Sequence, residues 1–304
     1  ERDSLAGIML PIGFVGLGNM GARMARHLLR AGHCVVAFDS NDERLVQLQR
    51  EGAQMAHSAA DVSARLAAQS AEATLITMLP GNEQVRDAFT TDRIGILAGA
   101  RPGLQLIDCS TVAPAVSREM HAAARERECD FVDAPVSGGV VGAEAASLTF
   151  MVGAANGASV ARATPVLELM GKRVLHCGGV GSGQAAKLAN NLVLAVSMLG
   201  VAEGMLLGQR LGVDKKVLAS VFDSSSARCW ASDTYNPCPG VLDGVPSSRE
   251  YEGGFAVDLM RKDLRLALGA APLPTVRTAR AALAAYDAAS GAGHGSKDFS
   301  VVYR

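Results

Sequence analysis

The sequence has no marked excess of charge of either sign. Its 304 residues include 29 Lys and Arg against 30 Asp and Glu, which gives a formal net charge of −1. Proteins that bind nucleic acids or anionic membranes usually present a strongly basic surface. The composition therefore argues against both kinds of partner, and we expect neither.

Long apolar runs and paired cysteine motifs are also absent. No uninterrupted apolar run reaches the roughly 18 residues that span a bilayer, and Glu203 interrupts the mostly apolar stretch 192–208. The six cysteines form no CxxC pair and no Cys/His spacing typical of metal ligands. We expect no membrane span, no metal site, and reduced, mostly buried thiols. Because the chain begins at Glu1 rather than Met, we expect a cut or processed N-terminus that has lost any targeting segment.

A glycine-rich loop stands between a strand and a helix near the start of the chain. After a loose lead-in over 1–11, apolar residues 12–15 predict a strand that runs into Gly-Leu-Gly-Asn-Met-Gly at 16–21. A helix over 22–29 and a second strand over 34–38 follow. This is the full context of a dinucleotide-binding fingerprint. A glycine-rich turn in a non-binding α/β domain is the alternative.

Each position of this loop has a physical reason in that interpretation. Gly16 permits the tight turn, Gly18 lets the backbone approach the pyrophosphate, and Gly21 allows close packing of helix on strand. The helix N-terminus, which we expect to begin at Asn19, supplies N–H groups and positive potential for the phosphates. Asn19 and Met20 are therefore candidate cofactor-binding residues.

Asp39 ends the second strand and bears on the choice of cofactor. Its carboxylate can accept hydrogen bonds from the adenosine-ribose hydroxyls and would repel a 2′-phosphate, which favours NAD over NADP. A helix is expected to open near Asn41, and Arg44 is the one nearby cation that argues for NADP. We interpret Arg44 as a solvated helix residue.

Two further strands end in residues suited to a cofactor wall. The strand predicted over 74–78 ends at Leu79-Pro80, and the strand over 104–109 ends at Ser110-Thr111. Doubly wound sheets bind ligands beyond the carboxyl ends of their strands. Ordinary turn chemistry, in which Ser110 or Thr111 caps the next helix, is an equally good interpretation.

The next strand leads into Asp133-Ala-Pro-Val-Ser-Gly-Gly139. The backbone N–H groups of Ser137, Gly138 and Gly139 suit a small anion such as a carboxylate, although a loop that needs positive φ would have the same sequence. The alternation continues with strands over 148–152 and 173–177 and a helix over 159–169.

The stretch Gly181–Gly212 contains no proline, and its apolar residues recur three or four apart, which predicts one long, largely buried helix. Gly183, Lys187 and Asn191 fall on one face of it and indicate a small polar site beside a glycine notch. The alternative is that Lys187 extends its amine to the surface. A lysine near the positive end of a helix is disfavoured, which hints at another use for it.

The alternation of strands and helices ends at Gly178-Gly179, and only helical patterns follow residue 212. We therefore predict an α/β protein with a Rossmann-type doubly wound domain over 1–179. An all-α substrate and oligomerisation domain over 180–304 would be joined to it by the long helix. The second domain's predicted helices cover 215–222, 255–270 and 276–289, with a polar loop over 233–254. We interpret 260–263 as a solvated helix face. The tail at 296–300 could cap a helix or close a site, and the sequence leaves its role open.

Taken together, the motifs at 13–21, 133–139, 183–191 and 262–263 resemble those of the β-hydroxyacid dehydrogenases in order and spacing. The stretch Arg228–Pro246 is similar to the branch of that family that acts on 3-hydroxyisobutyrate. The resemblance extends from Ile12 to Val302. It has two departures: Gln84 stands where the family has an asparagine near the cofactor, and the region 268–274 is a few residues short.

The resemblance implies a role for each matching residue. Lys187 is the catalytic lysine, and Asn191, one turn later, holds the substrate. Ser137, Gly138 and Gly139 bind the substrate carboxylate. The remaining matches contact NAD: Leu79, Pro80, Thr111 and, closing over the nicotinamide end, Lys262. Gln84 is kept as a candidate cofactor contact, although it departs from the family's asparagine at that position.

The implied reaction is reversible NAD-dependent oxidation of 3-hydroxyisobutyrate to methylmalonate semialdehyde, a step of valine catabolism. Lys187 would take the hydroxyl proton. Burial and the helix N-terminus favour its uncharged form, whereas a substrate carboxylate favours the charged one. Related reductases of tartronate, glyoxylate or succinic semialdehyde share every motif, and phosphogluconate dehydrogenases share the first domain but are longer. A non-enzymatic dinucleotide-binding scaffold would not need Lys187.

The family usually forms homodimers or homotetramers, which the resemblance therefore implies here. It also implies the mitochondrial matrix as location for a eukaryotic source, and the cytoplasm for a bacterial one.

Overall fold

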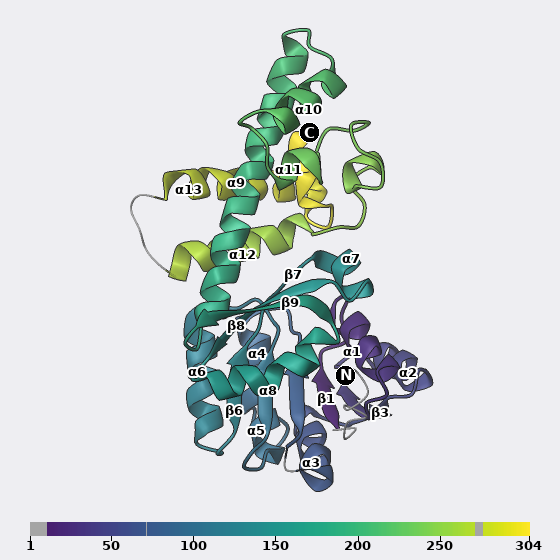
Figure 1. Ribbon diagram of the computed structural model, residues 1–304, viewed down its shortest axis with the longest axis vertical. Helices are drawn as coiled ribbons and strands as arrows, with labels where there is room; N and C mark the ends of the chain where they lie inside the picture. The colour runs from purple at the N-terminus through teal and green to yellow at the C-terminus, as the bar shows by residue number, and fades with distance from the viewer. Residues whose placement is uncertain (1–10, 71, 271–275) are drawn as a thin grey trace, which may run out of the picture. The chain divides into compact units, whose positions relative to one another are not determined.

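The computed structural model describes residues 11–70, 72–270 and 276–304 (Figure 1). Most of the expected lead-in, residues 1–10, and most of the short region at 268–274 lie outside the described residues. Contacts divide the chain into two units, one ending at Lys187 and one beginning at Leu188. The division falls inside the long helix, whereas the sequence placed it ahead of the helix, at Gly179.

The first unit is built on a nine-stranded sheet in the order β3-β2-β1-β4-β5-β6-β8-β7, with β9 beside β8. Strands β1 to β6 are parallel, which confirms the doubly wound prediction, and β8 runs antiparallel to β6 and β7. The sequence pattern did not predict this antiparallel edge. The strands are β1 Ile12–Val15, β2 Val35–Phe38, β3 Gln54–Met55, β4 Thr74–Thr77, β5 Gln105–Asp108, β6 Asp130–Asp133, β7 Val136–Ser137, β8 Leu148–Ala154 and β9 Gly171–Gly178.

Helices cover both faces of this sheet because successive strand residues point to opposite sides. Leu75 and Leu106 belong to one buried cluster, and their neighbours Ile76 and Ile107 belong to another. Helix α1 begins at Gly21 rather than at Asn19 as predicted. The helices of this unit are α1 Gly21–Arg30, α2 Asp42–Arg50, α3 Ala59–Gln69, α4 Asn82–Thr90, α5 Ile96–Gly99, α6 Pro114–Arg125, α7 Gly139–Glu144 and α8 Gly157–Glu168.

The second unit is helical, as predicted, and its described residues contain one isolated β-bridge, between Ala256 and Asp298. Its core packs Met198 and Met205 of α9 with Tyr286 and other apolar side chains. The predicted loop 233–254 includes a short helix. The helices are α9 Ser182–Arg210, which begins in the first unit, α10 Lys215–Ser224, α11 Trp230–Asp233, α12 Val257–Ala270 and α13 Arg277–Ala289, with short η1 Pro246–Ser248, η2 Ser290–His294 and η3 Phe299–Tyr303.

Helix α9 corrects the expectation about membrane spans. By length and composition it could cross a membrane, because its apolar window has a mean hydropathy of 1.7. The sequence prediction considered only uninterrupted apolar runs, and Glu203 interrupts the run in α9. One charged residue changes the mean hydropathy of a long window only slightly. A core helix passes the same test, and α9 buries Ala195, Met198 and Met205 completely. Only 33% of its apolar window is buried, however, so the prediction of a largely buried helix is wrong.

Asp298 explains the C-terminal tail whose role the sequence left open. Its buried carboxylate accepts hydrogen bonds from the backbone N–H groups of Phe255 and Ser300, at 2.8 and 2.9 Å, and from the Tyr235 hydroxyl at 2.9 Å. Burial raises the pKa of Asp298. Asp298 therefore caps the N-terminus of η3 and joins the tail to Phe255, in the segment before α12.

All six cysteines are unpaired thiols. Cys109, Cys129 and Cys238 are buried and the other three are half-buried, so the prediction of mostly buried thiols holds for half of them. Within 11–70, 72–270 and 276–304, no group of three or more His, Cys, Asp and Glu side chains is arranged to hold a metal ion.

Candidate active site

The candidate residues of the first unit gather at one edge of its sheet. The register pairs Val15 with Phe38 and Thr77, Thr77 with Asp108, and Asp108 with Asp133. These five residues end their strands, so the loops that follow all leave from the same edge. This is the edge at which parallel α/β sheets bind ligands.

Two of the three fingerprint glycines leave no room for a side chain, and the third faces open space. Gly16 has φ +97°, and a Cβ there would lie 2.4 Å from the Met78 carbonyl oxygen. A Cβ on Gly21 would lie 1.9 Å from the Gly16 carbonyl oxygen. Gly18, in contrast, faces open space with no atom within 4 Å of a Cβ. A tight, closely packed loop with one open glycine fits the approach of a pyrophosphate.

Asp39 is more firmly held than the sequence suggested. It is 7% exposed, and its carboxylate accepts hydrogen bonds from the Leu17 N–H at 2.5 Å and the Asn41 N–H at 2.8 Å. The bond to Leu17 ties the carboxylate to the glycine loop. Arg44 was interpreted as merely solvated, but its Nη1 lies 3.8 Å from Asp39 Oδ1, although its side chain is half-exposed.

The strand ends after β4 and β5 are joined to each other. Ser110 is fully buried, and its hydroxyl accepts a hydrogen bond from the Leu79 N–H at 2.8 Å. Neither Ser110 nor Thr111 caps the next helix, because the N-cap residue of α6 is Ala113. The Leu79 side chain would lie 2.9 Å from a Cβ on Gly16, beside the fingerprint. The other predicted wall residues are half-buried Thr111 and exposed Pro80 and Gln84.

The Ser137–Gly139 segment forms the short strand β7 and the start of α7. Gly138 and Gly139 have φ of +131° and +60°, so the loop does need positive φ. Gly139 faces open space. Helix α7 is tied to the fingerprint helix α1, since His27 Nε2 lies 2.8 Å from the Ala143 carbonyl oxygen and Arg23 pairs with Glu144 at 2.8 Å. The two predicted binding loops thus belong to one connected structure.

The predicted polar face near the start of α9 is buried. Lys187 is 8% exposed and Asn191 is 2% exposed, so Lys187 does not extend to the surface. Gly183 is a packing contact rather than an open notch, because a Cβ there would lie 2.2 Å from the Met151 carbonyl oxygen and 2.8 Å from Asp133 Oδ2. Burial raises the pKa of the Asp133 carboxyl to about 6, although two backbone N–H groups that bind it act in the opposite direction.

In the second unit, Asn191 has a partner that the sequence did not assign. Its side-chain amide donates to Asp263 Oδ2 at 2.6 Å, and Lys262 Nζ lies 3.3 Å from Asp263 Oδ1. The interpretation of 260–263 as a solvated face is wrong for Met260 and Asp263, which are 0% and 2% exposed. Helical position could have indicated this, because Asp263 lies on the buried stripe of α12 that Val257, Met260 and Leu264 form.

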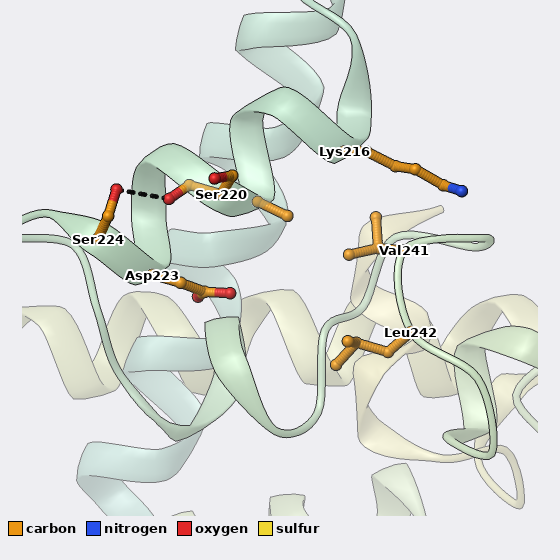
Figure 2. A pocket seen from close by; sticks show the side chains of 7 residues that line it. Lys216, Ser220, Asp223, Ser224, Val241 and Leu242 are labelled. Carbon is orange, nitrogen blue, oxygen red and sulfur yellow. Dashed lines mark hydrogen bonds between the residues drawn. The ribbon is translucent and has the colours of Figure 1, made fainter.

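A surface hollow of about 510 Å³ lies elsewhere in the second unit, beside α10. Figure 2 shows Lys216, Asp223 and Val241 around it, and the Ser224 hydroxyl bonded to the Ser220 carbonyl oxygen. None of the predicted site residues lines this hollow.

Comparisons with known proteins agree with this arrangement. The family model of the NAD-binding domain of 6-phosphogluconate dehydrogenase matches residues 11–179, and the model described as NAD-binding of NADP-dependent 3-hydroxyisobutyrate dehydrogenase matches 181–304. The human mitochondrial 3-hydroxyisobutyrate dehydrogenase is 45% identical over 97% of this chain and 86% of its own length. The NAD-dependent L-serine dehydrogenase of Pseudomonas aeruginosa is 45% identical over 97% of each chain.

A solved structure supports the same relationship. The Mycobacterium tuberculosis 3-hydroxyisobutyrate dehydrogenase, determined with L-serine, superposes with a TM-score of 0.89 at 40% identity and covers 97% of this chain and 98% of that one. Similarity of this extent across both matched regions establishes the family. The chain belongs to the 3-hydroxyisobutyrate dehydrogenases of the β-hydroxyacid dehydrogenase family and is an NAD-dependent oxidoreductase.

Proposed function

We propose that the protein oxidises 3-hydroxyisobutyrate to methylmalonate semialdehyde, the reaction of valine degradation, with Lys187 as general acid and base. The observation that carries the proposal is the pair of buried polar side chains, Lys187 and Asn191, on consecutive turns of one helix. A buried lysine is costly to retain for packing alone. In an NAD-dependent oxidoreductase, a buried lysine can transfer the proton of the substrate hydroxyl.

NAD, when bound, accepts the hydride from the alcohol carbon. The protein must then orient that carbon and manage one proton. Hydride leaves more easily as the hydroxyl loses its proton, and Lys187 is proposed to accept that proton and to return it to the carbonyl oxygen in the reverse direction. Asn191, held by Asp263, would orient the substrate.

The other binding roles are proposed on the same basis. Backbone N–H groups of Ser137, Gly138 and Gly139 would hold the substrate carboxylate. The glycine loop with Asn19, Met20 and Asp39 would hold the dinucleotide at the N-terminus of α1. Leu79, Pro80, Gln84, Thr111 and Lys262 would complete the cofactor contacts.

An initial-rate screen tests the substrate. We expect the highest kcat/KM for 3-hydroxyisobutyrate with NAD, against tartronate, glycerate and 4-hydroxybutyrate as comparison acids. Serine is the second candidate, because a serine dehydrogenase is as similar to this chain as the hydroxyisobutyrate enzymes are. A higher kcat/KM for serine would replace the proposed substrate, and no turnover of any of these acids would refute the proposal.

We further propose that the protein forms a homodimer or homotetramer. The second unit exposes large apolar side chains near the end of α9 and on α10: Leu207 is 60% exposed, Leu211 75% and Val217 55%. Burying such surface against another copy is favourable by about 25 cal/mol per Å². Light scattering should give a multiple of the 31.4 kDa chain mass, and a single species at that mass would overturn the assembly. Leu207→Glu should shift the distribution toward the monomer.

We propose the mitochondrial matrix as location if the source is eukaryotic, and the cytoplasm if it is bacterial. The human relative is named as mitochondrial, and a relative of the same identity comes from a bacterium.

A further inference from the structure

Two fully buried polar side chains join the start of α9 to the ends of the central strands. Asp133, the last residue of β6, accepts a hydrogen bond from the Gly181 N–H at 2.7 Å on Oδ1 and from the Gln184 N–H at 3.0 Å on Oδ2. Both Asp133 and Gln184 are 0% exposed. A carboxylate placed at the N-terminal N–H groups of a helix is favoured by the helix dipole and satisfies groups that lack helical partners.

The Gln184 side chain makes the second connection. Its Oε1 accepts a hydrogen bond from the Val112 N–H at 3.1 Å, and its Nε2 donates to the Ser110 carbonyl oxygen at 2.8 Å. One amide therefore bonds to the backbone on both sides of Thr111, in the segment that follows β5. We call Asp133, Gln184 and these four hydrogen bonds the α9 latch.

The packing of Gly183 fixes the helix further. A Cβ at this position would lie 2.2 Å from the Met151 carbonyl oxygen and 2.9 Å from that of Asp133. The first turn of α9 therefore packs closely against the backbone at Met151 and Asp133, with no room for a side chain at Gly183. Because a helix is stiff over one turn, the position of this turn sets the position of Lys187, which follows Gly183 by one turn.

We propose that the α9 latch is a positioning device that sets Lys187 against the Ser110–Val112 segment of the cofactor site. The inference rests on the proposed function, in which Lys187 transfers the proton. Apolar packing would hold the helix without specifying its rotation, whereas a fully satisfied buried polar network specifies one arrangement. A displacement of about 1 Å in a catalytic group can cost on the order of 10²-fold in rate.

The chain offers a matched control for Gln184. Gln105 of β5 is also 0% exposed, and its amide donates to Asp130 Oδ2 at 2.9 Å and to the Ser159 carbonyl oxygen at 3.0 Å, both outside α9. We expect both Gln184→Ala and Gln105→Ala to lower the melting temperature, with the larger decrease for Gln184→Ala, because the buried Gln105 Oε1 accepts no hydrogen bond from the described residues. Only Gln184→Ala should lower kcat, by about 10- to 10²-fold, and this loss should exceed any loss of NAD affinity that arises through the Thr111 segment. Gln184→Met, which keeps the volume, serves if the alanine variant does not fold.

A double-mutant cycle separates the latch from the function on which it depends. If the latch acts through Lys187, Gln184→Ala should barely change the residual kcat of Lys187→Ala. If Gln184→Ala lowered kcat by the same factor in the wild-type and the Lys187→Ala backgrounds, the positioning role of the latch would be wrong. Equal kcat values for Gln184→Ala and Gln105→Ala would also contradict it, and neither result would affect the proposed function. A Lys187→Ala enzyme with normal kcat would refute the proposed function, and with it the purpose assigned to the latch, whatever the Gln184 variants show.

Discussion

Replacing Lys187 by alanine should lower kcat by about 10²- to 10⁴-fold, the usual contribution of general acid–base catalysis. The side chain is buried on α9 with 8% exposure, so solvent cannot readily substitute for its amine. NAD affinity should change little, because the glycine loop is untouched. The measurement is kcat at saturating substrate, with NAD binding followed separately by fluorescence. Retention of more than about a tenth of the wild-type kcat would show that Lys187 is not the proton-transfer group.

Two further substitutions test the roles of Lys187 and Asn191 separately. Lys187→Arg should fail almost as badly as alanine, because a guanidinium does not lose its proton near neutral pH. Asn191→Ala should appear largely in KM if the amide chiefly holds bound substrate. It should also lower stability, because it removes the 2.6 Å hydrogen bond to Asp263 and leaves that buried carboxylate with fewer donors.

Replacing Asp39 by alanine should weaken NAD binding by about 1.5–3 kcal/mol, the usual worth of a hydrogen bond to a charged group. It should also narrow the preference for NAD over NADP, since the carboxylate that repels a 2′-phosphate is gone. Titration of both cofactors against both proteins measures the two effects. An unmodified protein that turns over faster with NADP at equal concentration would contradict the assignment of Asp39.

The structure separates two contributions to that loss. Asp39 also anchors the Leu17 N–H, so part of the weakening comes from a loosened glycine loop and should fall on both cofactors. Arg44, whose Nη1 lies 3.8 Å from Asp39 Oδ1, would be left without this partner and should attract the 2′-phosphate. Arg44→Ala in the Asp39→Ala background should therefore remove the gain for NADP, while Arg44→Ala alone should leave NAD affinity nearly unchanged.

The sequence by itself determined the features that depend on neighbouring residues. A strand, a GxGxxG loop, a helix and a second strand ending in Asp39 specify the fingerprint locally, and the structure has each of these elements within a residue or two. The apolar period of 181–212 likewise defined α9, because a 3.6-residue repeat has one structural interpretation. The family followed from the same local motifs.

Tertiary structure alone decided which distant polar groups meet. Asp263 binds Asn191 across 72 positions, and Asp133 binds the Gln184 N–H across 51. No local period encodes such pairs, because a buried polar residue shows the same sequence pattern as a solvated one until its partner is brought against it. The division of the chain inside α9 has the same cause. The first turn of that helix is bonded to strand ends that precede it by many residues, so it belongs to the sheet rather than to the helices that follow.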